Sequence, residues 1–263
     1  MSETPAGGSV TRTDADGVAT LTLLRPGLTH ESRGDLLAAV QSVAADPSVR
    51  AVVLTGSGRA FCVGQDLAQH VESLRGNAAM SLSVVEDEYN PLIRALSALR
   101  VPVVVGINGA CAGAGLGIAL AGDLRVAAAG AKFTTAFTGV GLGSDSALGW
   151  RLTHAVGAAR AAELLLLAEP FPAEAALEWG LVTRVVEPER VLEEAQALAV
   201  RLASGPTAAY AAVKQVLAAA ATDGLDETLD REAVLQVELG RTADHSEAVE
   251  AFLAKRPPRF TGS

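Results

Sequence analysis

The sequence predicts an α/β protein, and two observations carry that prediction. Short β-rich runs alternate with segments of helical spacing along the N-terminal part of the chain, a pattern typical of sheets built with crossover connections. After about residue 189 the β-rich runs stop and only helical segments follow. We therefore expect a sheet-containing core at 1–200 and a C-terminal helical region at 201–263.

The individual elements follow from local composition and periodicity. Five short runs rich in β-branched and aliphatic residues are the predicted strands: 18–24, 51–56, 101–107, 124–128 and 181–186. Segments with helical spacing lie between them, at 35–45, 67–76, 84–99, 114–121, 146–167 and 173–179. Four more helices are predicted in the tail: VLEEAQALAVRLA, PTAAYAAVKQVLAAAA, LDETLDREAVLQVELG and HSEAVEAFLA. Pro206 suits a first helical turn, and Gly205, Gly224 and Gly240 suit helix ends.

Composition narrows the class of protein. The 263 residues are 49% hydrophobic and 19% charged, which suits a globular protein with a substantial core. There is no apolar run of about 18 residues, so no membrane span is expected. The polar N-terminus lacks the order of a secretory signal, which favours a cytoplasmic location. The net charge of −9 argues against a nucleic-acid partner, because such a surface needs a basic field.

The two cysteines do not indicate a disulfide or a metal site. Cys62 and Cys111 are far apart in the sequence, and the spacing typical of metal ligands is absent. For Cys62 a role as a small buried apolar residue is favoured over a role as a nucleophile. We expect no bound metal.

Two strand ends run into glycine-rich turns. They are AVVLTGSGRAFCVGQDL (51–67) and VPVVVGINGACAGAGLGIAL (101–120). A strand, a glycine-rich turn and a helix start can expose backbone N–H groups to a developing negative charge. The dinucleotide pattern GxGxxG fails at Ile118, and neither a P-loop nor a GxSxG elbow is present. The alternatives are a backbone anion site or two tight turns without a ligand.

These stretches resemble one family. AFCVGQDL (60–67) together with INGACAGAGLGIALAGDLRVA (107–127) is similar to the enoyl-CoA hydratase/isomerase, or crotonase, superfamily. LLRP (23–26), the segment 156–186 and AFLAKRPPRF (251–260) agree, so the similarity covers about 18–260. The resemblance implies a spiral of ββα units and C-terminal helices that build trimers or dimers of trimers. It also implies an acyl-CoA thioester substrate, with coenzyme A as part of the substrate and no separate cofactor.

The resemblance assigns binding roles to particular residues. The backbone N–H groups of Gln65 and Ala114 would form an oxyanion hole for the thioester oxygen. Asp66 is in addition a predicted N-cap, because the next helix begins at Leu67 and Asp is favoured there. Arg25 and Lys255 would meet the phosphates of coenzyme A. The expected coenzyme A contacts are Arg25, Ala60, Cys62, Asp66, Leu67 and Lys255.

The acid–base groups differ from those of two-glutamate hydratases. The two glutamate positions of the family are occupied here by Gly117 and Phe137, and neither side chain can transfer a proton. Asp145 lies in GVGLGSDSALG (139–149), where some branches of the family carry an Asp within P-D-S-G-G. Those branches include enoyl- and dienoyl-CoA isomerases, a ring-epoxide isomerase of phenylacetate degradation and a haloaryl-CoA dehalogenase. AFCVGQDL and the AGAG variant look most like the phenylacetate type.

Asp145 is therefore the predicted catalytic residue, although an Asp among glycines can also simply form a turn. An apolar surround that includes Phe137 would raise its pKa and strengthen it as a base. The predicted activity is isomerisation of a double bond or ring epoxide through an enolate. The alternatives are an enoyl-CoA hydratase that uses Asp145 and water, and a non-catalytic protein that binds coenzyme A.

Two stretches depart from the family pattern. The chain has SDSAL in place of P-D-S-G-G. Near the start it reads RPGLTHES instead of R-P-x-x-x-N-A-L, so that His30 and Glu31 replace Asn and Ala. Both His30 and His70 are expected to be surface or structural residues, and His70 is the first alternative base.

Overall fold

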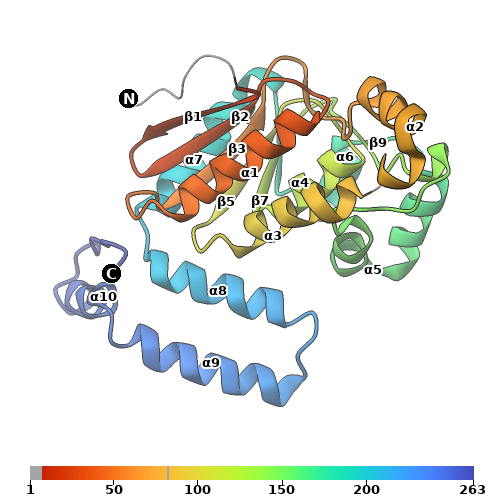
Figure 1. Cartoon of the computed structure of the whole chain (residues 1–263). Coiled ribbons are helices and arrows are strands. Elements are labelled where there is room, and N and C mark those ends of the chain that lie inside the picture. Colours follow the sequence, from red (N-terminus) through yellow and green to blue (C-terminus); the bar gives the residue numbers. More distant parts are fainter. Residues whose placement is uncertain (1–7, 82) are drawn as a thin grey trace.

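The computed structural model describes residues 8–81 and 83–263 and confirms the α/β fold class (Figure 1). Its larger sheet has the strand order β1-β2-β3-β5-β7-β10. β1 pairs antiparallel with β2, and every later neighbour in this sheet is parallel. The strands are β1 (Val10–Ala15), β2 (Val18–Leu23), β3 (Ala51–Gly56), β5 (Val103–Ile107), β7 (Leu124–Ala128) and β10 (Arg184–Val186).

A second, smaller sheet has the order β4-β6-β8-β9. Its strands are β4 (Ala60–Cys62), β6 (Ala110–Ala112), β8 (Lys132–Thr134) and β9 (Phe171–Pro172). β4, β6 and β8 each follow a strand of the larger sheet and each precede a helix: α2 (Leu67–Ser81), α4 (Ala114–Ala121) and α5 (Leu148–Leu167). The chain therefore repeats a ββα unit, and the expected spiral of such units is confirmed.

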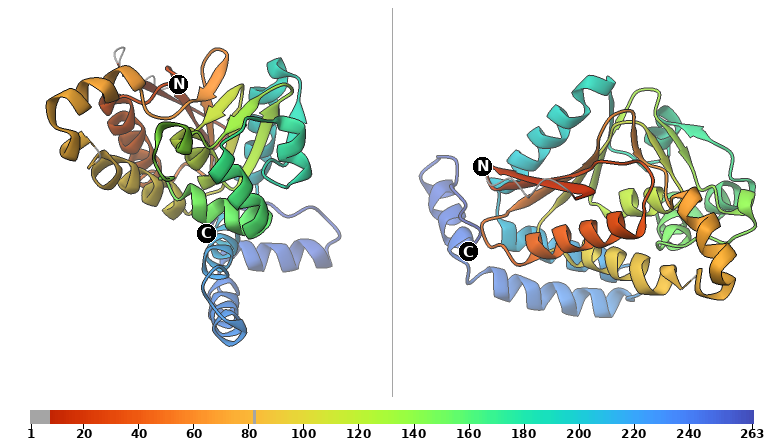
Figure 2. Two further views of the ribbon diagram at one scale, coloured as in Figure 1. Left: turned by 90° about the vertical axis from the view of Figure 1, so that its right-hand side faces the viewer. Right: turned by 45° about the horizontal axis from the view of Figure 1, so that its top comes forward.

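Burial on both faces explains why the strands of the larger sheet are continuous apolar runs. Ala51 and Val53 share a core with Ala195 and Ala199 of α7 (Val191–Ala203). The alternate residues of β3, exemplified by Leu54, point to the other core. That core includes side chains of α1 (His30–Ala44) and α3 (Asn90–Ala98). The right-hand view of Figure 2 shows α7 and α1 on opposite sides of the sheet.

The last three helices lie outside the core that contains the two sheets. They are α8 (Thr207–Ala219), α9 (Leu225–Leu239) and α10 (Ala243–Leu253), and α8 and α9 extend away from the core (Figures 1 and 2). Polar contacts hold the start of α8 and the chain end to the core: Arg50 donates to the carbonyls of Gly205 and Phe260. Lys214 of α8 pairs with Asp123 at 2.8 Å.

Several elements differ from the sequence prediction. The strands β1, β4, β6, β8 and β9 were not predicted. The predicted helix 84–99 is divided into a π-helical turn, η1 (Val85–Tyr89), and α3. α1 begins five residues before the predicted start because the Thr29 side chain accepts a hydrogen bond from the Ser32 N–H and caps the helix. The remaining short elements are η2 (Thr138–Val140), α6 (Ala173–Glu178) and η3 (Pro188–Arg190).

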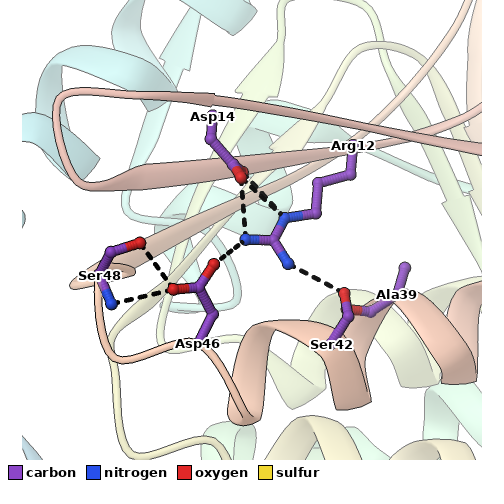
Figure 3. Close-up of polar contacts among 6 residues, drawn as sticks. All are labelled: Arg12, Asp14, Ala39, Ser42, Asp46 and Ser48. Carbon is purple, nitrogen blue, oxygen red and sulfur yellow. Dashed lines mark hydrogen bonds and ion pairs between the residues drawn. The ribbon is translucent and has the colours of Figure 1, made fainter. Parts of the chain in front are cut away.

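β1 is held against α1 by a polar cluster around one arginine (Figure 3). Arg12 pairs with Asp14 at 2.9 Å and with Asp46 at 2.6 Å, and it also donates to the Ser42 hydroxyl. Apolar periodicity does not reveal such polar contacts, which is one reason why β1 was not predicted from the sequence.

Within the described ranges, no helix combines the length and apolar character needed to cross a bilayer. The cytoplasmic location stays a prediction.

Candidate active site

The two glycine-rich turns meet in space. Gly64 has φ +81°, and a Cβ there would lie 3.2 Å from both the Ala112 carbonyl oxygen and the Ala114 nitrogen. A Cβ on Gly115 would lie 2.2 Å from the Cys62 carbonyl oxygen. Only glycine allows backbones to approach this closely. The chain after β4 is therefore packed directly against the first turn of α4.

This packing places the Ala114 nitrogen beside Gly64, the residue that precedes Gln65. Leu28 flanks Gln65 on one side, because its N–H donates to the Gly64 carbonyl at 2.8 Å and its carbonyl accepts from the Asp66 N–H at 3.1 Å. Ala114 is the first residue of α4, where helical N–H groups have no partner within the helix. Among the described residues, neither the Gln65 nor the Ala114 N–H donates to a protein group. Both amides are available to an anionic oxygen.

Asp145 lies on the turn between η2 and α5 and is partly buried. Burial raises the pKa of its carboxyl group above the ordinary value, and the hydrogen bond from Ser146 Oγ at 2.7 Å acts in the opposite direction. The raised pKa agrees with the sequence-based expectation and makes the carboxylate a stronger base. The turn interpretation holds as well, because the Asp145 carbonyl accepts from the Leu148 N–H at 2.9 Å.

The Asp145 turn occupies the space that a side chain at position 117 would need. A Cβ on Gly117 would lie 2.6 Å from Ser146 Cβ and 2.8 Å from the Ser146 carbonyl oxygen. A glutamate at this position and the observed turn therefore exclude each other. Phe137 lies near the N-terminus of α4, with ring atoms 3.9 Å from the Cβ position of Gly113. The packing thus places Ser146, the neighbour of Asp145, against α4, and neither family glutamate position carries a carboxylate.

The turn itself is conformationally strained. Ser146 and Ala147 have φ values of +54° and +57°, in the left-handed region that disfavours residues with a Cβ. The family pattern has glycine at position 147, so the alanine found here occupies an unfavourable conformation. Strain of this kind persists where the surrounding structure holds it, often at functional sites.

Asp66 and Leu67 lie at the beginning of α2. The predicted N-cap is confirmed, because Asp66 Oδ1 accepts from the Gln69 N–H at 2.9 Å. Leu67 is 68% exposed and is accessible to a ligand. The coenzyme A contacts assigned to both residues stay predictions.

Cys62 is completely buried, as favoured from the sequence. Burial raises the pKa of its thiol to about 12, so the thiol is neutral near pH 7 and is not an activated nucleophile. It has no accessible surface for the predicted coenzyme A contact. Ala60 is partly exposed, and its carbonyl accepts from Asn108 Nδ2.

Across the described ranges, no three His, Cys, Asp or Glu side chains gather as a metal site requires.

The two predicted phosphate contacts are far from each other along the fold. Arg25 is exposed just after β2, and Lys255 is exposed just after α10. Figures 1 and 2 show α10 at the end of the molecule opposite α2 and α5. Within one chain, Lys255 therefore lies far from α5, and its predicted contact with coenzyme A stays a prediction.

His30 and His70 both have polar neighbours. His70 Nδ1 lies 3.2 Å from the side-chain nitrogen of Gln65. His30 is exposed, and its Nδ1 lies 2.9 Å from a carboxylate oxygen of Glu88. Glu88 also pairs with Arg33 at 2.6 Å, and the Arg33 side chain is only 4% exposed. Sequence reasoning missed this buried arginine, because no apolar periodicity or motif marks it.

Comparison with known proteins agrees with this geometry. The enoyl-CoA hydratase/isomerase family model matches residues 13–263, and the chain belongs to that family. It is 44% identical over 250 residues to the 1,2-epoxyphenylacetyl-CoA isomerase of Escherichia coli, covering 94% of this chain and 95% of that protein. It is also 44% identical over 255 residues to a probable enoyl-CoA hydratase of Rhodobacter capsulatus, covering 94% and 96%.

A solved structure confirms the crotonase fold. The crystal structure of a putative enoyl-CoA hydratase/isomerase from Mycobacterium abscessus is 48% identical, has a TM-score of 0.94, and is matched over 97% of this chain and 100% of that one. The family resemblance seen in the sequence is thereby confirmed. The names of the relatives include both isomerases and hydratases.

Proposed function

We propose that the chain isomerises acyl-CoA thioesters through an enolate. Asp145 removes a proton from the carbon next to the thioester, while the N–H groups of Gln65 and Ala114 bind the oxygen that becomes negative. The protonated Asp145 then returns the proton to a different carbon, which moves the double bond. Coenzyme A enters and leaves as part of the substrate, and no further cofactor takes part.

One observation carries this proposal: the Ser146 backbone packs on Gly117 and excludes a glutamate there. With Phe137 at the second glutamate position, we assign the acid to Asp145, whose neighbour Ser146 packs on α4. A single carboxylate suits a reaction in which one group first takes and then returns a proton. The similarity to an epoxyphenylacetyl-CoA isomerase supports a ring epoxide as a second substrate type.

A hydratase is the alternative, because a relative of equal identity carries that name. It would need Asp145 to activate water for addition to a 2-enoyl-CoA. A non-catalytic coenzyme A-binding protein is a further alternative, but it would not need a carboxylate with a raised pKa at this position.

We further propose a homotrimer or a dimer of trimers, because the last three helices expose many large apolar side chains. These include Leu217, Leu225, Leu229, Val234, Val237, Phe252 and Leu253. Such an assembly could bring Lys255 of one copy to the site of another.

The function is tested with purified wild type and Asp145→Asn on 3-enoyl-CoA, 2-enoyl-CoA and an aryl-acetyl-CoA epoxide, with products followed by mass in deuterated solvent. Wild type is expected to convert the 3-enoyl or epoxide substrate with no added water. Asp145→Asn should lower kcat/KM by about 10²–10⁴, the usual contribution of a general acid–base group. Since Asp145 must be deprotonated to act as a base, wild-type activity should rise with pH through a pKa above that of an ordinary Asp. The residual activity of Asp145→Asn should not show this rise with pH.

The matched control is Asp14→Asn, the same exchange in the exposed cluster around Arg12 (Figure 3). It should leave the activity unchanged. Addition of one water to 2-enoyl-CoA that persists in Asp145→Asn would contradict the proposal, and His70 would then be tested as the base.

A further inference from the structure

Tyr89 is a buried residue whose hydroxyl has no use in the mechanism above. No part of the residue is exposed, and Oη has no hydrogen-bond partner in the described part of the chain. Buried polar groups are nearly always paired, so each exception calls for an explanation such as a functional role. The sequence alone did not separate Tyr89 from ordinary core residues.

The backbone around Tyr89 is also unusual. Tyr89 ends the π-helical turn η1, which interrupts the helix predicted at 84–99. Single π-turns within helices are rare and occur often at functional sites, because the extra residue shifts the side chains that follow. The local backbone thus places Tyr89 where a regular α-helix would not.

A continuous set of contacts links Tyr89 to the Gln65 amide. The guanidinium carbon of Arg33 lies 5.1 Å from the centre of the Tyr89 ring. The same guanidinium group donates to the Leu28 carbonyl at 2.7 Å, and Leu28 is the residue that flanks Gln65. Tyr89 therefore packs against the arginine that holds the backbone beside one of the two amides.

Tyr89 also lies near the other half of the site. Burial raises the pKa of its hydroxyl, and the Arg33 guanidinium lowers it through its charge and a polar contact. The charge of Asp145 raises the pKa as well, which indicates that the hydroxyl lies on the side of the core that carries the Asp145 turn. The group stays protonated near pH 7 and is available as a hydrogen-bond donor.

We propose that Tyr89 determines specificity by donating a hydrogen bond to an oxygen on the acyl group of the bound thioester. The proposal rests on the function proposed above, in which Gln65 and Ala114 bind the thioester oxygen and Asp145 moves a carbon-bound proton. A second oxygen, such as that of an aryl ring epoxide, needs a donor of its own, and the Tyr89 hydroxyl donates to no protein group among the described residues. Because Tyr89 is fully buried, the side chains over it must shift when the acyl group binds, a common change at binding sites.

The test compares the binding of two stable ligands, phenylacetyl-CoA and 2-hydroxyphenylacetyl-CoA, to the full-length chain by calorimetry. They differ by one oxygen at the ring position where an epoxide would carry it. Wild type should bind the hydroxylated ligand about tenfold more tightly, as expected for one buried hydrogen bond. Tyr89→Phe should lose this preference and keep its affinity for phenylacetyl-CoA.

Tyr210→Phe is the matched control, because Tyr210 is the other tyrosine of the chain and packs beside Gly205 at the start of α8. It should keep the preference. Tyr89→Phe should melt at the same temperature as wild type or higher, because it removes an unpaired buried hydroxyl. A merely structural role would instead lower the melting temperature and weaken both ligands alike, which would overturn the proposal.

An unchanged preference in Tyr89→Phe, or no preference in wild type, would also overturn the proposal. Isomerisation of 3-enoyl-CoA is measured in parallel to separate the two proposals. Its acyl group carries no second oxygen, so Tyr89→Phe should retain that activity. If wild type shows the binding preference but isomerises none of the substrates, the proposed function fails while the role of Tyr89 stands.

Discussion

The two sheets of this protein are held in place by different means. In the larger sheet, strands such as β3 and β5 are five or six residues long and bury apolar side chains on both faces. The strands of the smaller sheet have two or three residues. Their positions depend on glycines: a Cβ on Gly56, Gly109 or Gly115 would lie 2.5, 2.1 or 2.2 Å from a carbonyl oxygen of the facing chain.

Because of this difference, we expect the larger sheet to matter most for stability and the smaller sheet to matter most for function. Burial of apolar area stabilises the larger sheet, and many substitutions of similar volume would preserve it. The smaller sheet also buries large side chains such as Phe61 and Phe133, but its close glycine contacts set the backbone positions next to Gln65 and at Ala114. A change in the first region should therefore alter unfolding, and a change in the second should alter catalysis.

Among changes that compare the two sheets, the largest effect is expected for Gly115→Ala. The new Cβ would meet the Cys62 carbonyl and push α4 away from the chain after β4, which displaces the Ala114 amide. We expect kcat/KM to fall by about 10²–10³, as when one oxyanion donor is lost. The control is Gly34→Ala in α1, where a Cβ would meet no atom within 4 Å. Full activity of Gly115→Ala on 3-enoyl-CoA would show that these amides do not take part.

Leu54→Ala tests the larger sheet. Leu54 lies on β3 with no exposed surface, and its truncation should lower the free energy of unfolding by about 2–5 kcal/mol in urea denaturation. Below the unfolding transition, kcat/KM should stay near that of wild type. Leu192→Ala, at a 43% exposed position on α7, should change stability much less. A loss of activity in folded Leu54→Ala would mean that the two sheets are coupled.

Ala147→Gly should have the smallest effect and the opposite sign. Glycine tolerates the left-handed conformation found at φ +57°, so the free energy of unfolding should rise by about 0.5–1 kcal/mol after the entropy cost of glycine. The control Ala197→Gly lies inside α7 and should lower stability by about 0.5–1 kcal/mol. Equal losses in the two variants would show that the Asp145 turn is not strained.

The sequence predicted the larger sheet well and the smaller one hardly at all. The run 51–56 was recognised as β3 because its apolar residues form a continuous β-rich segment between turn signals. β4, β6 and β8 are too short to show any periodicity, and they become strands only by pairing with one another. The π-turn at Tyr89 was missed for a related reason, because its sequence resembles an ordinary helical turn.

The features of the candidate site also fall into two groups, those that the sequence shows and those that only the structure shows. By itself, the sequence determined the α/β class, the family, the absence of both glutamates and the presence of Asp145 in a turn, because these depend on residue identity and on near neighbours. Only the tertiary structure decided that Ser146 packs on Gly117, that Gly64 lies against Ala114, and that the Tyr89 hydroxyl is buried and makes no hydrogen bond within the described residues. These contacts join segments far apart in the chain, and close packing, which no local pattern encodes, sets their geometry.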